Sequence, residues 1–82
     1  MTTKKRIQAV LDTVRGALTE PQGLEVESNL QAGEERLALE FLVDFLLEAD
    51  AVVTTATKTE IQSLATALRS TRRGPELLPV AG

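Results

Sequence analysis

Apolar residues at the start of the chain recur at the spacing of one face of an α-helix. The positions that fit the i, i+3, i+4, i+7, i+11 pattern are Ile7, Val10, Leu11, Val14 and Leu18. This pattern is typical of an amphipathic helix that buries one face. Thr2 or Thr3 can cap the first turn, since a threonine hydroxyl accepts a hydrogen bond from a free backbone N–H there. Residues 20–23, Glu-Pro-Gln-Gly, interrupt the pattern and predict the end of this helix.

The next segment, residues 24–32, has a weaker apolar pattern. Val26 and Leu30 are one helical turn apart, and Gly33 suits the left-handed backbone conformation that ends many helices. We predict a short helix here of about two turns, which has too little apolar surface to be stable alone and must lie against other helices.

The densest pattern runs over residues 34–49. Its apolar positions are Leu37, Ala38, Leu39, Phe41, Leu42, Val43, Phe45, Leu46, Leu47 and Ala49. They make one face and extend around both sides, which is typical of a central helix with neighbours on several sides. Polar residues recur within it at four-residue spacing, as Arg36, Glu40, Asp44 and Glu48. We expect these four residues, here called the acidic stripe, to reach water.

A fourth helix is predicted after a connection, residues 50–56, that is rich in β-branched side chains. Thr57 and Glu60 have the spacing of a capping box. The buried positions of this helix are Ile61, Leu64, Ala65 and Leu68. Gly74 and Pro75 end it. The prediction is therefore a single all-α domain over residues 1–75, a small bundle of three long helices and one short helix.

Residues 76–82 are expected to form a flexible C-terminal tail, because proline interrupts regular structure and terminal segments are seldom well packed. Three apolar side chains in this tail can still fill a groove on the bundle. They are Leu77, Leu78 and Val80.

Composition limits the chemistry that this chain can perform. It contains no cysteine and no histidine, so it lacks a thiolate nucleophile, the usual general base and the commonest zinc ligands. We therefore expect no enzymatic activity, no cofactor and no metal site. No run of residues approaches the roughly 20 apolar residues that span a bilayer, and no signal peptide is recognisable. A cytoplasmic protein without membrane contact is expected.

The net charge of −3 is unevenly distributed along the chain. Residues 1–19 carry a balance of +3, residues 20–50 carry −8 and residues 51–82 carry +2. The acidic middle repels phosphate backbones. The basic residues near both ends have the positions of solvated helix termini, so we expect no nucleic-acid partner.

The acidic stripe has two main interpretations. It is either the wet face that any buried helix needs, or a surface for a basic partner that neutralises like charges on successive turns. A hard cation shared by carboxylates at i and i+4 is a remote third, because the chain offers no histidine and no spaced loop of ligands. A separate comparison concerns acyl carrier proteins, which bear a prosthetic arm on a serine in an Asp-Ser-Leu motif at a helix start. The motif is missing here, because Ser28 follows Glu27 and precedes Asn29. A carrier role is therefore only a remote alternative.

One helix carries a likeness to a known family. The residues that carry it are Gly33-Glu34, Leu37-Ala38-Leu39-Glu40 and the alternating Leu42, Asp44, Leu46, Glu48 and Asp50. This run resembles MafI-type immunity proteins, which are small helical bacterial proteins encoded beside polymorphic or contact-dependent toxins. Members commonly have cysteine, glutamine and tyrosine where this chain has Val43, Phe45 and Leu47, so this helix is more apolar than theirs.

The resemblance implies an immunity protein that binds a cognate toxin with a basic surface, commonly a nuclease, and occludes its active site or substrate path. The residues expected at the interface are Glu40, Asp44, Glu48 and Asp50, with Glu34, Glu35, Glu25 and Glu27 at its rim. The alternative is a helical dimerisation or assembly module without a toxin-binding role. That module would use spare apolar surface over residues 41–47 to form a homodimer.

Overall fold

The computed structural model describes residues 1–81, which fold into helices joined by short connections. The helices are α1 (Thr3–Val14), α2 (Glu20–Gln31), α3 (Glu35–Glu48), α4 (Thr55–Ala67) and the single turn α5 (Gly74–Leu77), with a 3₁₀ turn, η1 (Arg15–Ala17). Extended pairing within residues 1–81 is limited to one parallel bridge between Val53 and Val80. The predicted all-α bundle is confirmed.

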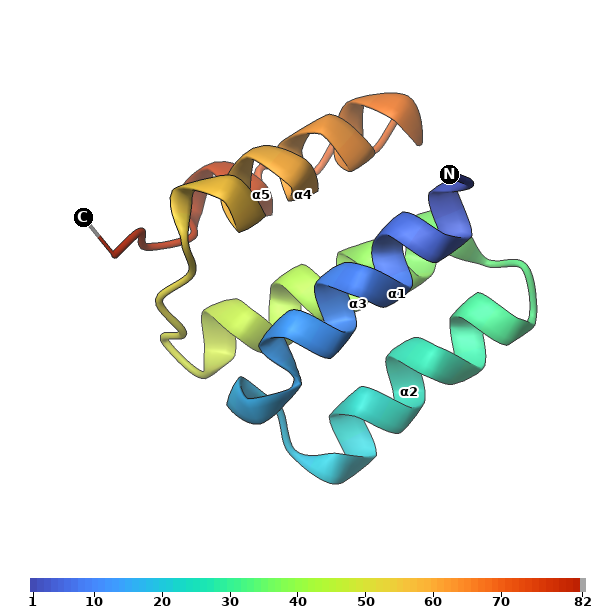
Figure 1. Cartoon of the computed structure of the whole chain (residues 1–82), viewed down its shortest axis with the longest axis horizontal. Coiled ribbons are helices and arrows are strands. Elements are labelled where there is room, and N and C mark those ends of the chain that lie inside the picture. The colour runs from blue at the N-terminus through green and yellow to red at the C-terminus, as the bar shows by residue number, and fades with distance from the viewer. Residues whose placement is uncertain (82) are drawn as a thin grey trace.

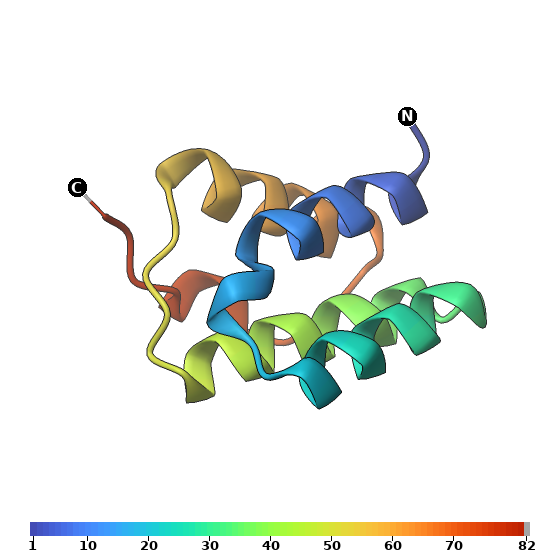
Figure 2. The ribbon, with the colours of Figure 1, turned by 60° about the horizontal axis from the view of Figure 1, so that its bottom comes forward.

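The helices are arranged in two layers. In the view of Figure 1, α1 lies in front of α3. Figure 2 shows α2 running beside α3 in one layer, with α1 and α4 in the other. α1 packs against α2, α3 and α4, while α5 packs against α3 and α4. The helix expected to be central, α3, therefore has neighbours on several sides.

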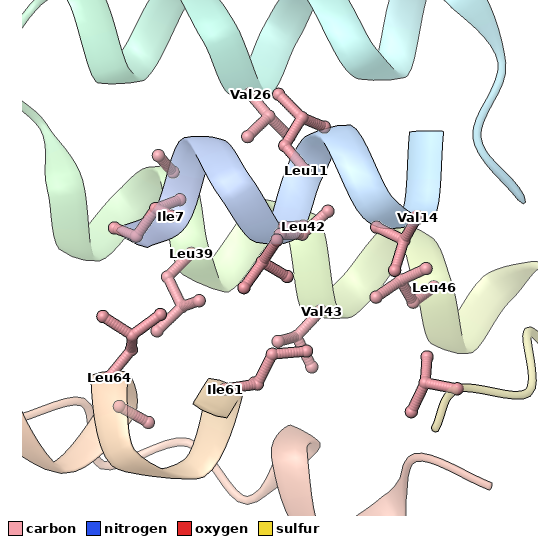
Figure 3. Close-up of a cluster of buried hydrophobic side chains, with 14 of the residues drawn as sticks. Ile7, Leu11, Val14, Val26, Leu39, Leu42, Val43, Leu46, Ile61 and Leu64 are labelled. Atoms are coloured by element: carbon pink, nitrogen blue, oxygen red, sulfur yellow. The ribbon is translucent and has the colours of Figure 1, made fainter. Parts of the chain in front are cut away.

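The core lies between the two layers. Figure 3 shows side chains of α1, α3 and α4 pointing toward a common centre, with Val26 reaching in from α2. α3 supplies the largest share of the buried side chains. They are Ala38, Leu39, Leu42, Val43 and Leu46. Ile7, Leu11, Ile61 and Leu64 are fully buried opposite them.

α2 begins earlier than the sequence pattern indicates. Thr19 caps it in a full capping box, in which its hydroxyl accepts from the Gln22 N–H and the Gln22 side chain accepts from the Thr19 N–H. Pro21 stands in the first turn, where its missing N–H has no helical partner to lose. The residues expected to interrupt the helices therefore start α2, which has 12 residues like α1.

The start of α4 also differs from the expectation. Thr54 is the N-cap, and its hydroxyl accepts from the Thr57 N–H. The expected capping box of Thr57 and Glu60 is wrong, because Thr57 is already the third residue of α4. Glu60 instead accepts hydrogen bonds from Arg6 on α1. The extended connection is correspondingly shorter than residues 50–56.

Residues 76–81, expected to be flexible, are docked on the bundle, and Gly82 lies outside the described residues. Leu78 is buried in the core and so fills a groove. The Lys58 ammonium donates to the carbonyl oxygens of Glu76 and Leu78, at 3.1 and 2.9 Å. Val53 donates to the Pro79 carbonyl at 3.0 Å. Apolar burial and hydrogen bonds thus hold this segment against the bundle.

Three helices end in the same way, with a left-handed residue just past the cap. These residues are Gly33 after α2, Asp50 after α3 and Arg69 after α4, with φ of 80°, 51° and 57°. At each end the following N–H reaches back to a carbonyl five residues earlier, as from Glu34 to Asn29 at 2.9 Å. Glycine suits this position, whereas Asp50 and Arg69 carry a steric cost there.

We predict that Arg69→Gly raises the free energy of unfolding by about 0.5–1 kcal/mol, because relief of left-handed strain exceeds the added unfolded-state entropy. Gly33→Ala is the matched reverse change and should lower it by about 1 kcal/mol. Urea denaturation with an unchanged slope measures both. A less stable Arg69→Gly protein would contradict the strain argument.

Candidate functional site

The segment that follows α4 covers the middle of the acidic stripe on α3, whereas Arg36 and Glu48 at its ends are exposed. The Ser70 hydroxyl donates to a Glu40 carboxylate oxygen at 2.8 Å. The Arg72 guanidinium donates to Asp44 at 2.7 Å and lies 4.0 Å from Glu40. The Glu40 and Asp44 side chains are only 18% and 33% exposed. Two of the residues expected to wait for a partner's cation therefore already have one from this chain.

The backbone of this covering segment packs closely against a side chain of α3 at Gly74. A Cβ on Gly74 would stand 2.8 Å from Val43 Cγ1, which is closer than real contacts allow. Gly74 is therefore required for α5 to approach α3. The cavity left between Glu40, Ser70 and Arg72 measures about 10 Å³, which is at the lower limit for holding one water molecule. It has no room for an organic ligand.

Glu27, one of the residues expected at the rim of the interface, is also paired within the chain. Arg15, in η1, donates to Glu27 of α2. On the opposite side of the bundle, Arg6 of α1 donates to Glu60 of α4 at 3.0 and 2.7 Å, and to the Ser63 hydroxyl at 3.2 Å. These pairs connect helices, so their acids are part of the scaffold.

Six carboxylates make no ion pair with any residue of 1–81. They are Glu20, Glu25, Glu34, Glu35, Glu48 and Asp50. All six lie on α2, on α3 or beside their ends, and so in one layer. Among the residues described, five side-chain cations also make no ion pair. Arg36 lies on α3, and the other four, Lys4, Lys5, Lys58 and Arg69, lie in the other layer or its loops. The structure thus separates the expected site residues into a paired group and an unpaired group.

A second stripe on α3 was missed by the sequence analysis. It consists of Leu37, Phe41, Phe45 and Glu48, at the i, i+4, i+8, i+11 spacing of one helix face, together with Glu34 at the N-cap, and is here called the outer stripe. Leu37 is 40% exposed and both phenylalanines are half-buried. Their rings stack with centroids 5.8 Å apart. The sequence feature that could have predicted this stripe is the wide apolar surface of residues 34–49, because the neighbouring helices cover only part of it.

The remaining sequence candidates are separate from this region or lack its features. Ser28 is exposed in the second half of α2 and not at a helix start. The described residues contain no group of three or more potential metal ligands. No helix within residues 1–81 is long and apolar enough to cross a membrane.

Comparisons with protein-family models, with curated proteins and with solved structures find no match for this chain.

The pairing of Arg72 with Asp44 can be measured by a double-mutant cycle of Arg72→Ala and Asp44→Ala. We expect a coupling of about 0.2–1 kcal/mol, because the Arg72 side chain is 50% exposed and water screens the pair. The coupling should shrink in high salt. Urea denaturation gives each free energy, and zero coupling would mean that the acidic stripe is free for a partner.

The Arg6–Glu60 pair should make stability depend on pH. Hydrogen bonds donated by Arg6 lower the pKa of Glu60 below its ordinary value of 4.5. A lowered folded-state pKa gives stability that is present above the unfolded pKa and is lost as pH falls through the folded one. The loss of stability in Glu60→Gln should therefore be larger at about pH 7 than at about pH 3. Equal losses in denaturation at both pH values would contradict this assignment.

Proposed function

We propose that this chain is an immunity protein, which binds a cognate toxin with a basic surface and blocks its active site or substrate path. The observation that carries the proposal is the group of six unpaired carboxylates in the α2–α3 layer. The resemblance of residues 33–50 to MafI-type immunity proteins gives this acidic layer a partner class. A nuclease fits best, because it presents cations to a phosphate backbone.

The charge distribution supports fast association with such a partner. Residues 20–50 carry a balance of −8, whereas the rest of the chain carries +5. Arg15 and Arg72 neutralise part of that charge from outside the α2–α3 layer. The remainder is predominantly negative, with Arg36 as the one unpaired cation of this layer among the described residues. Such a field steers a basic protein toward the layer and speeds its encounter.

The internal ion pairs change which residues carry the proposal. Contact of a toxin with Glu40 or Asp44 would first have to displace Arg72 and Ser70. The proposed interface therefore rests on the unpaired acids, chiefly Glu48 and Asp50 at the end of α3 and Glu34 and Glu35 at its start. Glu25 remains at the rim, and Glu27 is held by Arg15.

The dimerisation or assembly module is the competing proposal. Much of the apolar surface over residues 41–47 is unavailable to it, since Leu42, Val43 and Leu46 are buried in the core. The half-buried Phe41 and Phe45 still offer some apolar surface to a second copy of the chain.

The direct test is co-expression with the toxin encoded by the adjacent reading frame, and we expect growth to be restored. The purified pair should bind with an association rate that falls about tenfold or more as ionic strength rises from about 0.05 to 0.5 M, because steering is screened. Killing that continues while this chain is abundant and folded would refute the proposal. A stable homodimer with no affinity for the toxin would favour the assembly module.

A further inference from the structure

We infer that the outer stripe of α3 is a docking face for a basic protein surface that has an apolar centre. This inference rests on the proposed function and identifies the surface through which it acts. It differs from the sequence-based expectation, which placed the centre of the interface on Glu40 and Asp44.

The outer stripe has the geometry of a small interface. Its apolar members, Leu37, Phe41 and Phe45, lie between two carboxylates that make no ion pair within residues 1–81. Glu34 and Glu48 are 14 positions apart, which is roughly 21 Å along the helix at 1.5 Å per residue. The bound surface should therefore present cations about that far apart, on either side of an apolar group.

The apolar centre has the features of an anchor. The Phe41 and Phe45 rings are stacked, so their positions are set before any partner arrives. Interfaces commonly place aromatic side chains at the centre and charged groups at the rim. α2, α4 and α5 pack against α3, yet leave Leu37 40% exposed and both rings partly in water.

Charge decides between a basic partner and a second copy of this chain. Two copies that paired through this face about a twofold axis would place Glu34 and Glu48 of one copy opposite the same residues of the other. Like charges facing each other across an interface oppose association. A basic partner turns both repulsions into attractions, and so it is the occupant that the residues favour.

The test compares variants of the whole chain for binding to an inactive form of the adjacent-frame toxin. Leu37→Ser, and separately Glu34→Lys with Glu48→Lys, should each weaken binding by roughly tenfold or more. The matched control is Asp12→Lys with Glu76→Lys, which makes the same charge change on exposed residues outside the α2–α3 layer and should weaken binding by less than about threefold. Circular dichroism melting checks that each variant is folded.

The outcomes separate this inference from the proposed function. Tight binding by the wild type and by all outer-stripe variants would overturn the docking face and leave the immunity function standing. Failure of the folded wild type to bind or protect would remove both. A wild-type homodimer in sedimentation experiments that Leu37→Ser dissociates would assign the face to a second copy and overturn the basic partner.

Discussion

The structure depends on the apolar breadth of α3, which must be covered by a chain of only 82 residues. A helix that is apolar around most of its circumference needs neighbours on several sides. α2 packs along one flank, α1 and α4 cover the inner face, and α5 closes against the other flank. Small domains bury a limited fraction of their surface, so complete coverage is difficult to reach. Leu37, Phe41 and Phe45 lie where coverage ends.

The need to cover α3 also explains what the charges do. The segment after α4 has little helix of its own, yet it closes the flank of α3 through Gly74 and Leu78. Arg72 and Lys58 hold that segment at two points, one on the Asp44 carboxylate and one on backbone carbonyls. Each contact is exposed enough to contribute only modestly to stability. Their larger effect is positional, because the segment they hold covers Glu40 and Asp44 and makes these two carboxylates less available to a partner.

Sequence periodicity predicted α1, α3 and most of the core, because those features depend on residues within a few turns of each other. Local chemistry also identified Gly33 as a helix end. The start of α2 was misplaced because Pro21 marks a break in one context and a first turn in another. The pairing of Asp44 with Arg72 spans 28 positions, so no local rule reveals it. The division of the carboxylates into paired and unpaired groups follows only from the fold.

The incomplete coverage of α3 links stability to the proposed binding. The aromatic rings of Phe41 and Phe45 remain partly in water, so part of the free energy of burying them is not gained. The left-handed backbone at Asp50 and Arg69 also lowers the free energy of unfolding. A partner that binds only the folded chain adds stability in proportion to the logarithm of its concentration over its dissociation constant. Binding of a basic partner to this exposed face would therefore raise the free energy of unfolding of the chain. The inferred docking face thus lies where the rest of the chain covers α3 least.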